Sequence, residues 1–171
     1  EAALQVPMES LEELFAQIES NRRPGQRLDP NEARGMLDAL RRMLAFYEQL
    51  AEQGQVGLVY QMRVAAALRR MGDLHRNLRE YDDAETALLK AIGSLEHLLE
   101  TVPDDSKTHI QHARANYTLG RVYRDMGRLD KGNALIQVAL TELEALPNDA
   151  SQRRHIQELI SRYQRDVHRP E

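Results

Sequence analysis

The sequence predicts an all-α protein in which about seven antiparallel helices form one array of hairpins. Apolar residues recur at three- and four-residue spacing in seven segments, and no segment shows a convincing two-residue alternation typical of strands. The core must rely on Leu, Ala, Ile, Val and Met, because the chain has only two Phe, six Tyr and no Trp. Such residues favour packed helices over sheets. A pattern that repeats over two helices, described below, predicts the array.

Length and composition predict one domain without a membrane span. At 171 residues the chain can bury a substantial core, and 42% hydrophobic with 29% charged residues is typical of soluble globular proteins. No stretch approaches the roughly 18 consecutive apolar residues of a transmembrane helix. The absence of cysteine excludes disulfides and fits a reducing compartment, so the localisation is open, with the cytoplasm favoured. Because the chain starts at Glu1 without a signal peptide, we expect a fragment of a longer protein.

Residues 1–55 are predicted to form degenerate N-terminal helices that precede the repeats. The first begins at Ser10 and should stop before the turn at residues 23–25. The second begins at Asp29, where Pro30 suits the first helical position. Its expected apolar stripe consists of Met36, Leu37, Leu40, Met43, Leu44, Tyr47 and Leu50.

Four helices follow in two pairs, and a fifth closes the chain. The expected helices cover about residues 56–79, 82–101, 105–127, 130–146 and 149–168. The first pair forms repeat 1 at residues 56–101, and the second forms repeat 2 at residues 105–146. The helix at 149–168 is the predicted C-terminal cap, because the last unit of a stacked array has no neighbour to cover its apolar surface.

The two pairs are related by an offset of 48 residues, which takes Gly72 to Gly120. The same offset relates Tyr81 to Leu129, Ala84 to Gly132, Leu88 to Ile136, and Ala91 to Ala139. Two antiparallel helices can approach closely only where small side chains occupy their crossing points. The predicted repeat-packing residues are therefore Gly72, Ala84, Ala91, Gly120, Gly132 and Ala139.

These residues resemble the tetratricopeptide (TPR) repeat, which sets a small residue on the first helix, an aromatic three positions later, a turn, and small residues on the second helix. The resemblance implies a TPR-like superhelix that binds a partner in a concave groove and has no catalytic activity. Three features depart from the pattern. The spacing exceeds the usual length of roughly 34 residues, His75 stands where an aromatic is common, and Arg79 replaces the turn glycine that repeat 2 has as Gly127.

A closer resemblance covers most of the chain. Residues 40–48, 69–76 and 117–123 look like the long-period TPR region C-terminal to the kinase domain of large bacterial serine/threonine protein kinases. This similarity implies a regulatory or scaffolding segment of a signalling protein. It implies no kinase activity here, because the chain has no Gly-rich phosphate loop, no His-Arg-Asp and no Asp-Phe-Gly. We expect no enzyme activity and no cofactor.

The first helix of each repeat is basic, and the second is acidic. In the TPR family, ligands usually lie in the groove formed by the first helices. Carried over to this chain, the partner-binding positions are Arg69, Arg76, Asn77, Arg114, Tyr117, Arg121 and Arg124, with Asp73 and Asp125 beside them. Guanidinium groups bind carboxylates bidentately, so the sequence predicts an acidic peptide or protein partner. Alternatively, the arginines only solvate the face and pair with nearby acids, each exposed pair contributing about 0–1 kcal/mol.

Other classes of function are left open at this stage. Nucleic acid could contact the same arginines, but a net charge of −4 and few aromatic residues make this partner unlikely. Self-association through an exposed apolar edge remains an alternative. His109 and His112 are three apart on a helix, yet no third ligand stands at useful spacing, so no metal is predicted. His75 is interpreted as a packed core histidine; Tyr117, Tyr123 and Tyr163 are taken first as packing residues, and of the three only Tyr117 has a proposed groove role.

Overall fold

The computed structural model describes residues 28–52, 57–147 and 152–167, and these form six α-helices without a strand. The helices are α2 (Pro30–Glu52), α3 (Leu58–Leu78), α4 (Tyr81–Thr101), α5 (Ser106–Asp125), α6 (Leu129–Ala145) and α7 (Arg153–Val167). The all-α prediction is therefore confirmed. The helix expected from Ser10 lies outside the described residues.

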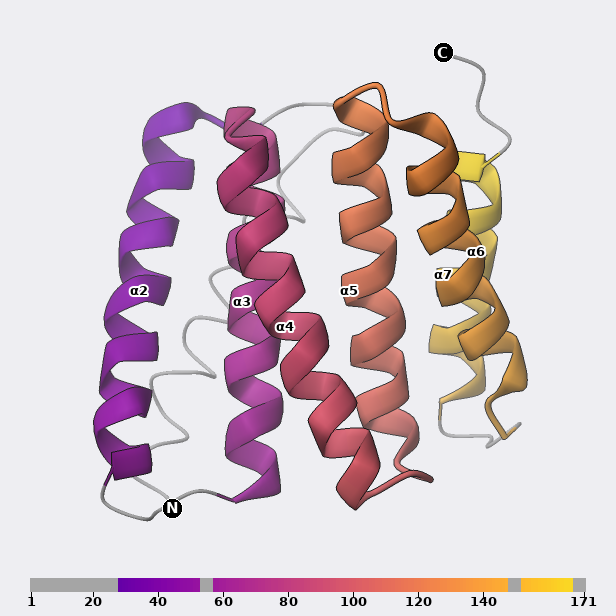
Figure 1. Cartoon of the computed structure of the whole chain (residues 1–171), viewed down its shortest axis with the longest axis horizontal. Helices are drawn as coiled ribbons and strands as arrows, with labels where there is room; N and C mark the ends of the chain where they lie inside the picture. The colour runs from indigo at the N-terminus through magenta and orange to yellow at the C-terminus, as the bar shows by residue number, and fades with distance from the viewer. Residues whose placement is uncertain (1–27, 53–56, 148–151, 168–171) are drawn as a thin grey trace.

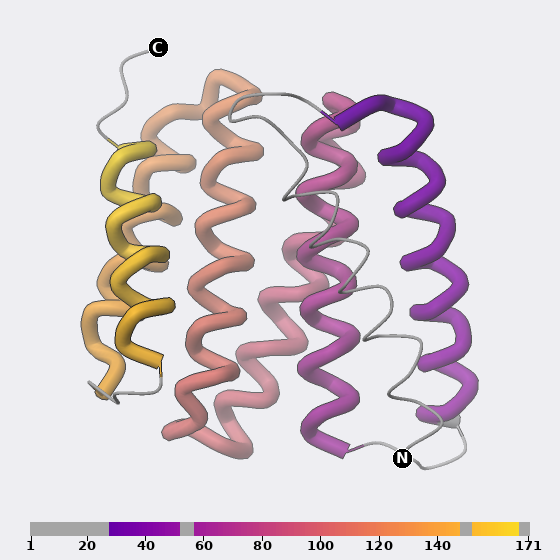
Figure 2. Tube along the Cα trace, turned by 180° about the vertical axis from the view of Figure 1, so that it is seen from behind, coloured from indigo at the N-terminus to yellow at the C-terminus, as the bar shows by residue number. Residues whose placement is uncertain are grey.

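Successive helices pack as antiparallel neighbours in two layers. Helix α3 pairs with α4, and α5 with α6, while α4 also packs on α5 and joins the two hairpins. In Figure 1, α4 and α6 lie toward the viewer, and α2 stands at one end beside α3. Seen from behind in Figure 2, α3, α5 and α7 form the other face. These three are the first helix of each hairpin and the final helix, so the fold brings them to one side.

Side chains at the helix starts explain two of the boundaries. Asp29 Oδ1 accepts hydrogen bonds from the backbone N–H groups of Asn31 (2.8 Å) and Glu32 (3.3 Å), and Pro30 is the first helical residue, as predicted. Asp105 caps α5 in the same way, accepting from Thr108 N at 2.8 Å.

The starts of α4 and α6 lie one residue before the predicted positions. Helix α4 begins at Tyr81 and α6 at Leu129, and neither helix has a side-chain hydrogen bond at its N-cap. Asp82 and Asp130 therefore stand inside the first turn instead of capping it. Carboxylates at that position are still favourable, because they face the positive end of the helix dipole.

The turns of the two hairpins have the same geometry at the offset of 48 residues. Arg79 N bonds to Arg76 O (3.0 Å) and Glu80 N to His75 O (2.9 Å) in the first; Gly127 N bonds to Arg124 O (2.9 Å) and Arg128 N to Tyr123 O (2.8 Å) in the second. Arg79 has φ 63° and Gly127 has φ 77°, so both stand in the left-handed region that favours glycine. The departure at Arg79 thus changes the residue and keeps the turn, at a cost of about 1 kcal/mol.

The glycines at the helix crossings also occupy corresponding positions. A Cβ atom added to Gly72 would lie 2.4 Å from Leu88 Cγ. One added to Gly120 would lie 2.8 Å from Ile136 Cγ1 and 2.7 Å from the backbone oxygen of Gly132. Since Leu88 and Ile136 are related by the same offset, each glycine admits the equivalent residue of its partner helix. Ala84, Ala91 and Ala139 are fully buried at these interfaces.

The core is divided into three successive clusters along the array. The first lies between α2 and α3 and contains the predicted stripe of α2, with Leu37, Leu40 and Tyr47 nearly inaccessible to solvent. The second joins α3, α4 and α5, and the third joins α5, α6 and α7. Each helix therefore depends on its neighbours, as expected of a stacked array.

Candidate functional site

The candidate site is the basic surface of α3, α5 and α7, referred to below as the arginine face. It consists of Arg69, Arg76, Arg114, Arg121, Arg124 and Arg162. Arg162 is exposed, whereas the other five are partly buried. The structure divides these arginines into those that pair with an acidic side chain or backbone oxygen of the chain and those that do not.

Arg76 is neutralised by two acids and links α3 to α5. Its Nε lies 3.3 Å from Asp125 Oδ2, within ion-pair distance although not aligned for a hydrogen bond, and its Nη1 lies 3.8 Å from Asp73 Oδ1. Only 11% of the Arg76 side chain is exposed. Asn77 is also engaged within α3, where Nδ2 donates to the backbone oxygen of Asp73 at 2.8 Å.

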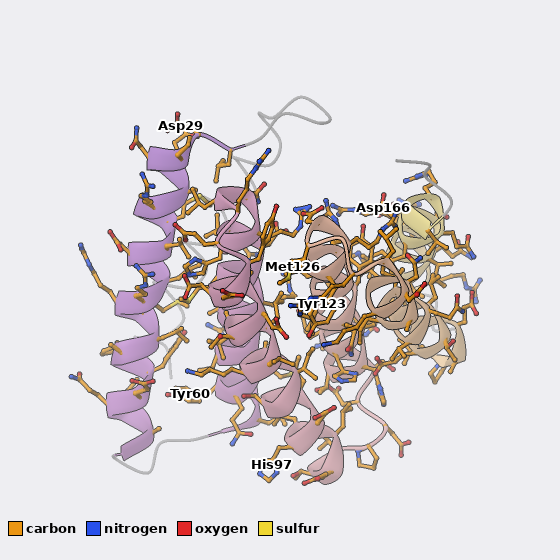
Figure 3. All side chains as sticks on the ribbon, turned by 45° about the horizontal axis from the view of Figure 1, so that its top comes forward. Asp29, Tyr60, His97, Tyr123, Met126 and Asp166 are labelled. Atoms are coloured by element: carbon orange, nitrogen blue, oxygen red, sulfur yellow. The ribbon has the colours of Figure 1, made fainter. Side chains whose placement is uncertain are left out.

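Asp166 of α7 is the centre of a second set of contacts (Figure 3). Arg121 Nε lies 3.8 Å from its carboxylate, Arg124 donates to its backbone oxygen, and the Tyr117 hydroxyl donates to its carboxylate. Burial, and then the Asp166 hydrogen bond, raise the pKa of Tyr117 above the ordinary tyrosine value. These contacts attach α7 to α5. The sequence analysis did not include Asp166, because its partners lie more than 40 residues away in the chain.

Tyr117 is a packing residue in this arrangement. Its ring stacks on Tyr163 with a centroid separation of 3.6 Å and an interplanar angle of 9°. Both side chains are almost fully buried, at 3% and 2% exposure, so neither ring face is open to a ligand. The guanidinium of Arg121 lies 5.6 Å from the Tyr117 ring centroid and covers the stack.

Arg69 and Arg114 differ from the arginines above. In the described part of the chain, neither has an ion pair with a carboxylate, and the Nε atom of Arg69 is buried without a hydrogen-bond partner. Desolvation lowers the pKa of Arg69 to about 9, and the nearby charges of Arg114 and Arg70 act in the same direction. The side chain still carries its charge at neutral pH, but that charge is not compensated locally.

A histidine pair on α5 shares one carboxylate of α6. His109 Nδ1 lies 2.8 Å from Glu142 Oε1, and His112 Nδ1 lies 2.8 Å from Glu142 Oε2. His109 Nε2 also lies 2.8 Å from the backbone oxygen of Pro103. The sequence analysis found no acidic partner for these histidines, which was wrong, because Glu142 is 30 and 33 residues away and only the hairpin brings it close.

This pair predicts a pH-dependent contribution to stability. Burial alone would lower the pKa of His109, but the bonds to Glu142 and to Pro103 outweigh it and raise the pKa above 6.5. A raised folded pKa gives stability that is complete below the unfolded value and is lost as the pH rises through the folded value. We therefore expect His109→Gln to lower the melting temperature more at about pH 5.5 than at about pH 8. His97→Gln is the control, because its ion pair with Glu100 is exposed; an equal pH effect in both variants would contradict the prediction.

One group of three side chains in the described ranges could hold a divalent cation. Ligand atoms of His75, Glu80 and Asp83 lie within 4.8 Å of one another, where α3 ends and α4 begins. Glu80 already contacts His75 Nδ1 at 2.7 Å, and Asp83 is exposed in the first turn of α4, a usual position for an acid. His75 is 5% exposed and lies where repeat 2 has Tyr123, in agreement with its interpretation as a core histidine.

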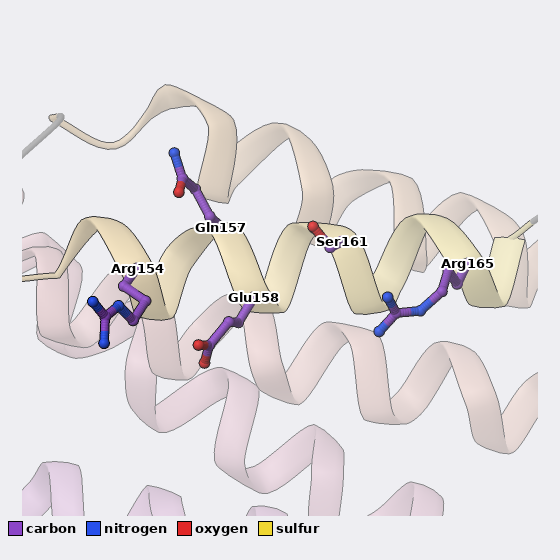
Figure 4. Close-up of a pocket in the computed structure, with 5 residues that line it drawn as sticks. All are labelled: Arg154, Gln157, Glu158, Ser161 and Arg165. Carbon is purple, nitrogen blue, oxygen red and sulfur yellow. The ribbon is translucent and has the colours of Figure 1, made fainter.

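The outer face of α7 is polar and differs from the arginine face. Arg154, Gln157, Glu158, Ser161 and Arg165 line a shallow hollow along this one helix (Figure 4). The opposite side of α7 carries Ile156, Leu159 and Tyr163, which are buried. A final helix that is apolar inside and polar outside is suited to close the array.

Residues 113–137 match the tetratricopeptide repeat family. The matched range runs from the middle of α5 through the turn at Gly127 into α6, and it includes the crossing glycines Gly120 and Gly132. No curated protein and no solved structure matches the chain. In the helices that the structure describes, none is long and apolar enough to cross a membrane. The fold and the matched repeat support a TPR-type protein, a class whose members typically act as non-catalytic protein-interaction scaffolds.

Proposed function

We propose that this chain binds an acidic segment of a protein partner on the arginine face and acts as a non-catalytic scaffold. The observation that supports this most directly is the charge of the face. Six arginines from three helices share the carboxylates of Asp73, Asp125 and Asp166. Following the resemblance to kinase-associated TPR regions, we further propose that the chain is the regulatory region of a bacterial signalling kinase.

The contacts suggest different roles for the predicted partner-binding residues. Arg76, Arg121 and Arg124 already contact Asp125 or Asp166, so a ligand that recruits them must break or share an internal contact. Arg69 and Arg114 need no such exchange, because they have no carboxylate partner in the ranges described. Charge-assisted hydrogen bonds to an unpaired guanidinium add to the binding energy without that cost. Arg69 and Arg114 are therefore proposed to carry recognition, while the others hold α3, α5 and α7 in place.

The test is binding of degenerate peptide mixtures that are rich in Asp and Glu, compared with mixtures of neutral composition. We expect the wild-type chain to prefer the acidic mixture and the double variant Arg69→Glu with Arg114→Glu to bind it about 100-fold more weakly. The control is Arg154→Glu with Arg165→Glu, which makes the same change of charge on the outer face of α7. Equal losses in both double variants, or no preference for acidic peptides, would contradict the proposal.

Reversal of Arg121 and Arg124 would be a poorer test. Both side chains contact Asp166, so two glutamates there would repel that residue and loosen α7 from α5. A loss of binding in that variant could then reflect a displaced helix. Melting temperatures of all variants should be measured for the same reason.

A further inference from the structure

The hydroxyl of Tyr163 lies at the centre of the arginine face. Its ring is held by the stack on Tyr117, at a centroid separation of 3.6 Å. In the described part of the chain this hydroxyl makes no hydrogen bond, whereas the Tyr117 hydroxyl bonds to Asp166. A polar group on a rigid, buried ring is thus left available to a ligand.

Arginines from three helices surround this hydroxyl. Burial raises the pKa of Tyr163, and the charges of Arg114, Arg69, Arg162 and Arg121 act against that rise. Arg69 belongs to α3, Arg114 to α5 and Arg162 to α7, so the cluster exists only when the array is assembled. Of the four arginines, only Arg121 has a carboxylate partner among the described residues, namely Asp166 at 3.8 Å.

The unpaired arginines are in position to donate hydrogen bonds. The Nε atom of Arg69 is buried, whereas its two terminal nitrogens are not among the buried atoms that lack a partner. Since those nitrogens make no hydrogen bond in the described ranges, they reach solvent. Arg162 is exposed and Arg114 is partly exposed, so the donors of all three side chains can meet a ligand from the solvent side.

The number and charge of these donors fit a phosphate group better than a carboxylate. A carboxylate offers two oxygens and one negative charge, which one guanidinium can satisfy bidentately. A phosphorylated side chain offers three terminal oxygens and a charge of about −1.5 to −2 at neutral pH, which suits several guanidinium groups that converge on one point. The hydroxyl of Tyr163 adds a neutral donor to the same oxygens.

We propose that Arg69, Arg114, Arg162 and the Tyr163 hydroxyl form a subsite for a phosphorylated serine or threonine side chain of the protein partner. This inference rests on the proposed function and specifies its ligand. A nucleic acid is a weaker fit, because single-stranded bases bind by stacking on exposed aromatic rings. The two rings at this site are buried against each other.

The test compares three degenerate peptide mixtures that differ only at one fixed position, which is phosphoserine, glutamate or serine. Fluorescence anisotropy should show that the wild-type chain binds the phosphoserine mixture about tenfold more tightly than the glutamate mixture. Arg69→Lys, Arg162→Ala and Tyr163→Phe should each reduce this preference. Lysine keeps the charge but loses the planar fork, and phenylalanine keeps the stack but loses the hydroxyl. Arg154→Ala is the control and should leave the preference unchanged.

The outcomes separate this inference from the proposed function. Equal affinity for the phosphoserine and glutamate mixtures, both above that for serine, would overturn the phosphate subsite and leave acidic-peptide binding intact. No preference for either acidic mixture would overturn both. Tighter binding of a single-stranded oligonucleotide than of the phosphoserine mixture would also overturn the inference. Competition by inorganic phosphate at millimolar concentration, lost in Arg162→Ala, would support it.

Discussion

Replacing Tyr163 with alanine is expected to destabilise the protein by about 3–5 kcal/mol, because the change removes a large, almost fully buried side chain. The ring stacks on Tyr117, and its loss would leave a cavity between α5 and α7. For a chain of this length, such a loss corresponds to a fall in melting temperature of about 10 °C or more. Thermal unfolding followed by circular dichroism measures it.

The effect should be concentrated at the C-terminal end of the array. Helix α7 is held mainly by the third core cluster and by the contacts around Asp166. Hydrogen exchange should therefore accelerate in α7 of the Tyr163→Ala variant, while α3 and α4 keep most of their protection. Gln164→Ala, at an exposed position of the same helix, is the control and should change little. Uniform acceleration across all helices would contradict a modular array.

The comparison of sequence and structure shows which features are local. Helix periodicity predicted α2 to α7, because each helix buries one stripe whose spacing is visible within a few turns. The crossing glycines were also predictable, since the offset of 48 residues places Gly72 and Gly120 opposite Leu88 and Ile136. The one-residue shifts at the starts of α4 and α6 are harder to foresee. In both hairpins the turn bonds use Glu80 and Arg128, which leaves the following residue as the first of the helix.

The charge pairing at the candidate site could not be predicted in the same way. Sequence alone indicates that the first helices are basic, but it does not tell which arginine meets which acid. Asp166 contacts residues of α5 that lie more than 40 positions earlier, and Glu142 contacts His109 across a hairpin. Such contacts depend on rotations of helices about their axes, and several rotations satisfy the same apolar stripe. The distinction between the paired Arg121 and the unpaired Arg69 therefore comes only from the assembled array.

Replacing Gly120 with alanine is expected to destabilise the protein by about 1–3 kcal/mol, because the added methyl group has no space at the crossing of α5 and α6. Its Cβ would lie 2.7 Å from the backbone oxygen of Gly132, and a backbone atom can move only if the whole helix moves. The melting temperature should fall by about 2–4 °C for each kcal/mol. Gly132→Ala should behave similarly, since its Cβ would lie 2.6 Å from Gly120 O.

Two other glycines make this prediction specific to the crossing. Gly93 of α4 is exposed and has no atom within 4 Å of an added Cβ, so Gly93→Ala should stabilise the protein by about 0.5–1 kcal/mol through helix propensity. Gly72→Ala should destabilise it, but less than Gly120→Ala, because the nearest atoms belong to the Leu88 side chain, which can shift. If Gly120→Ala proved as harmless as Gly93→Ala, the close packing of α5 on α6 would be wrong, and with it the placement of the arginines that α5 carries.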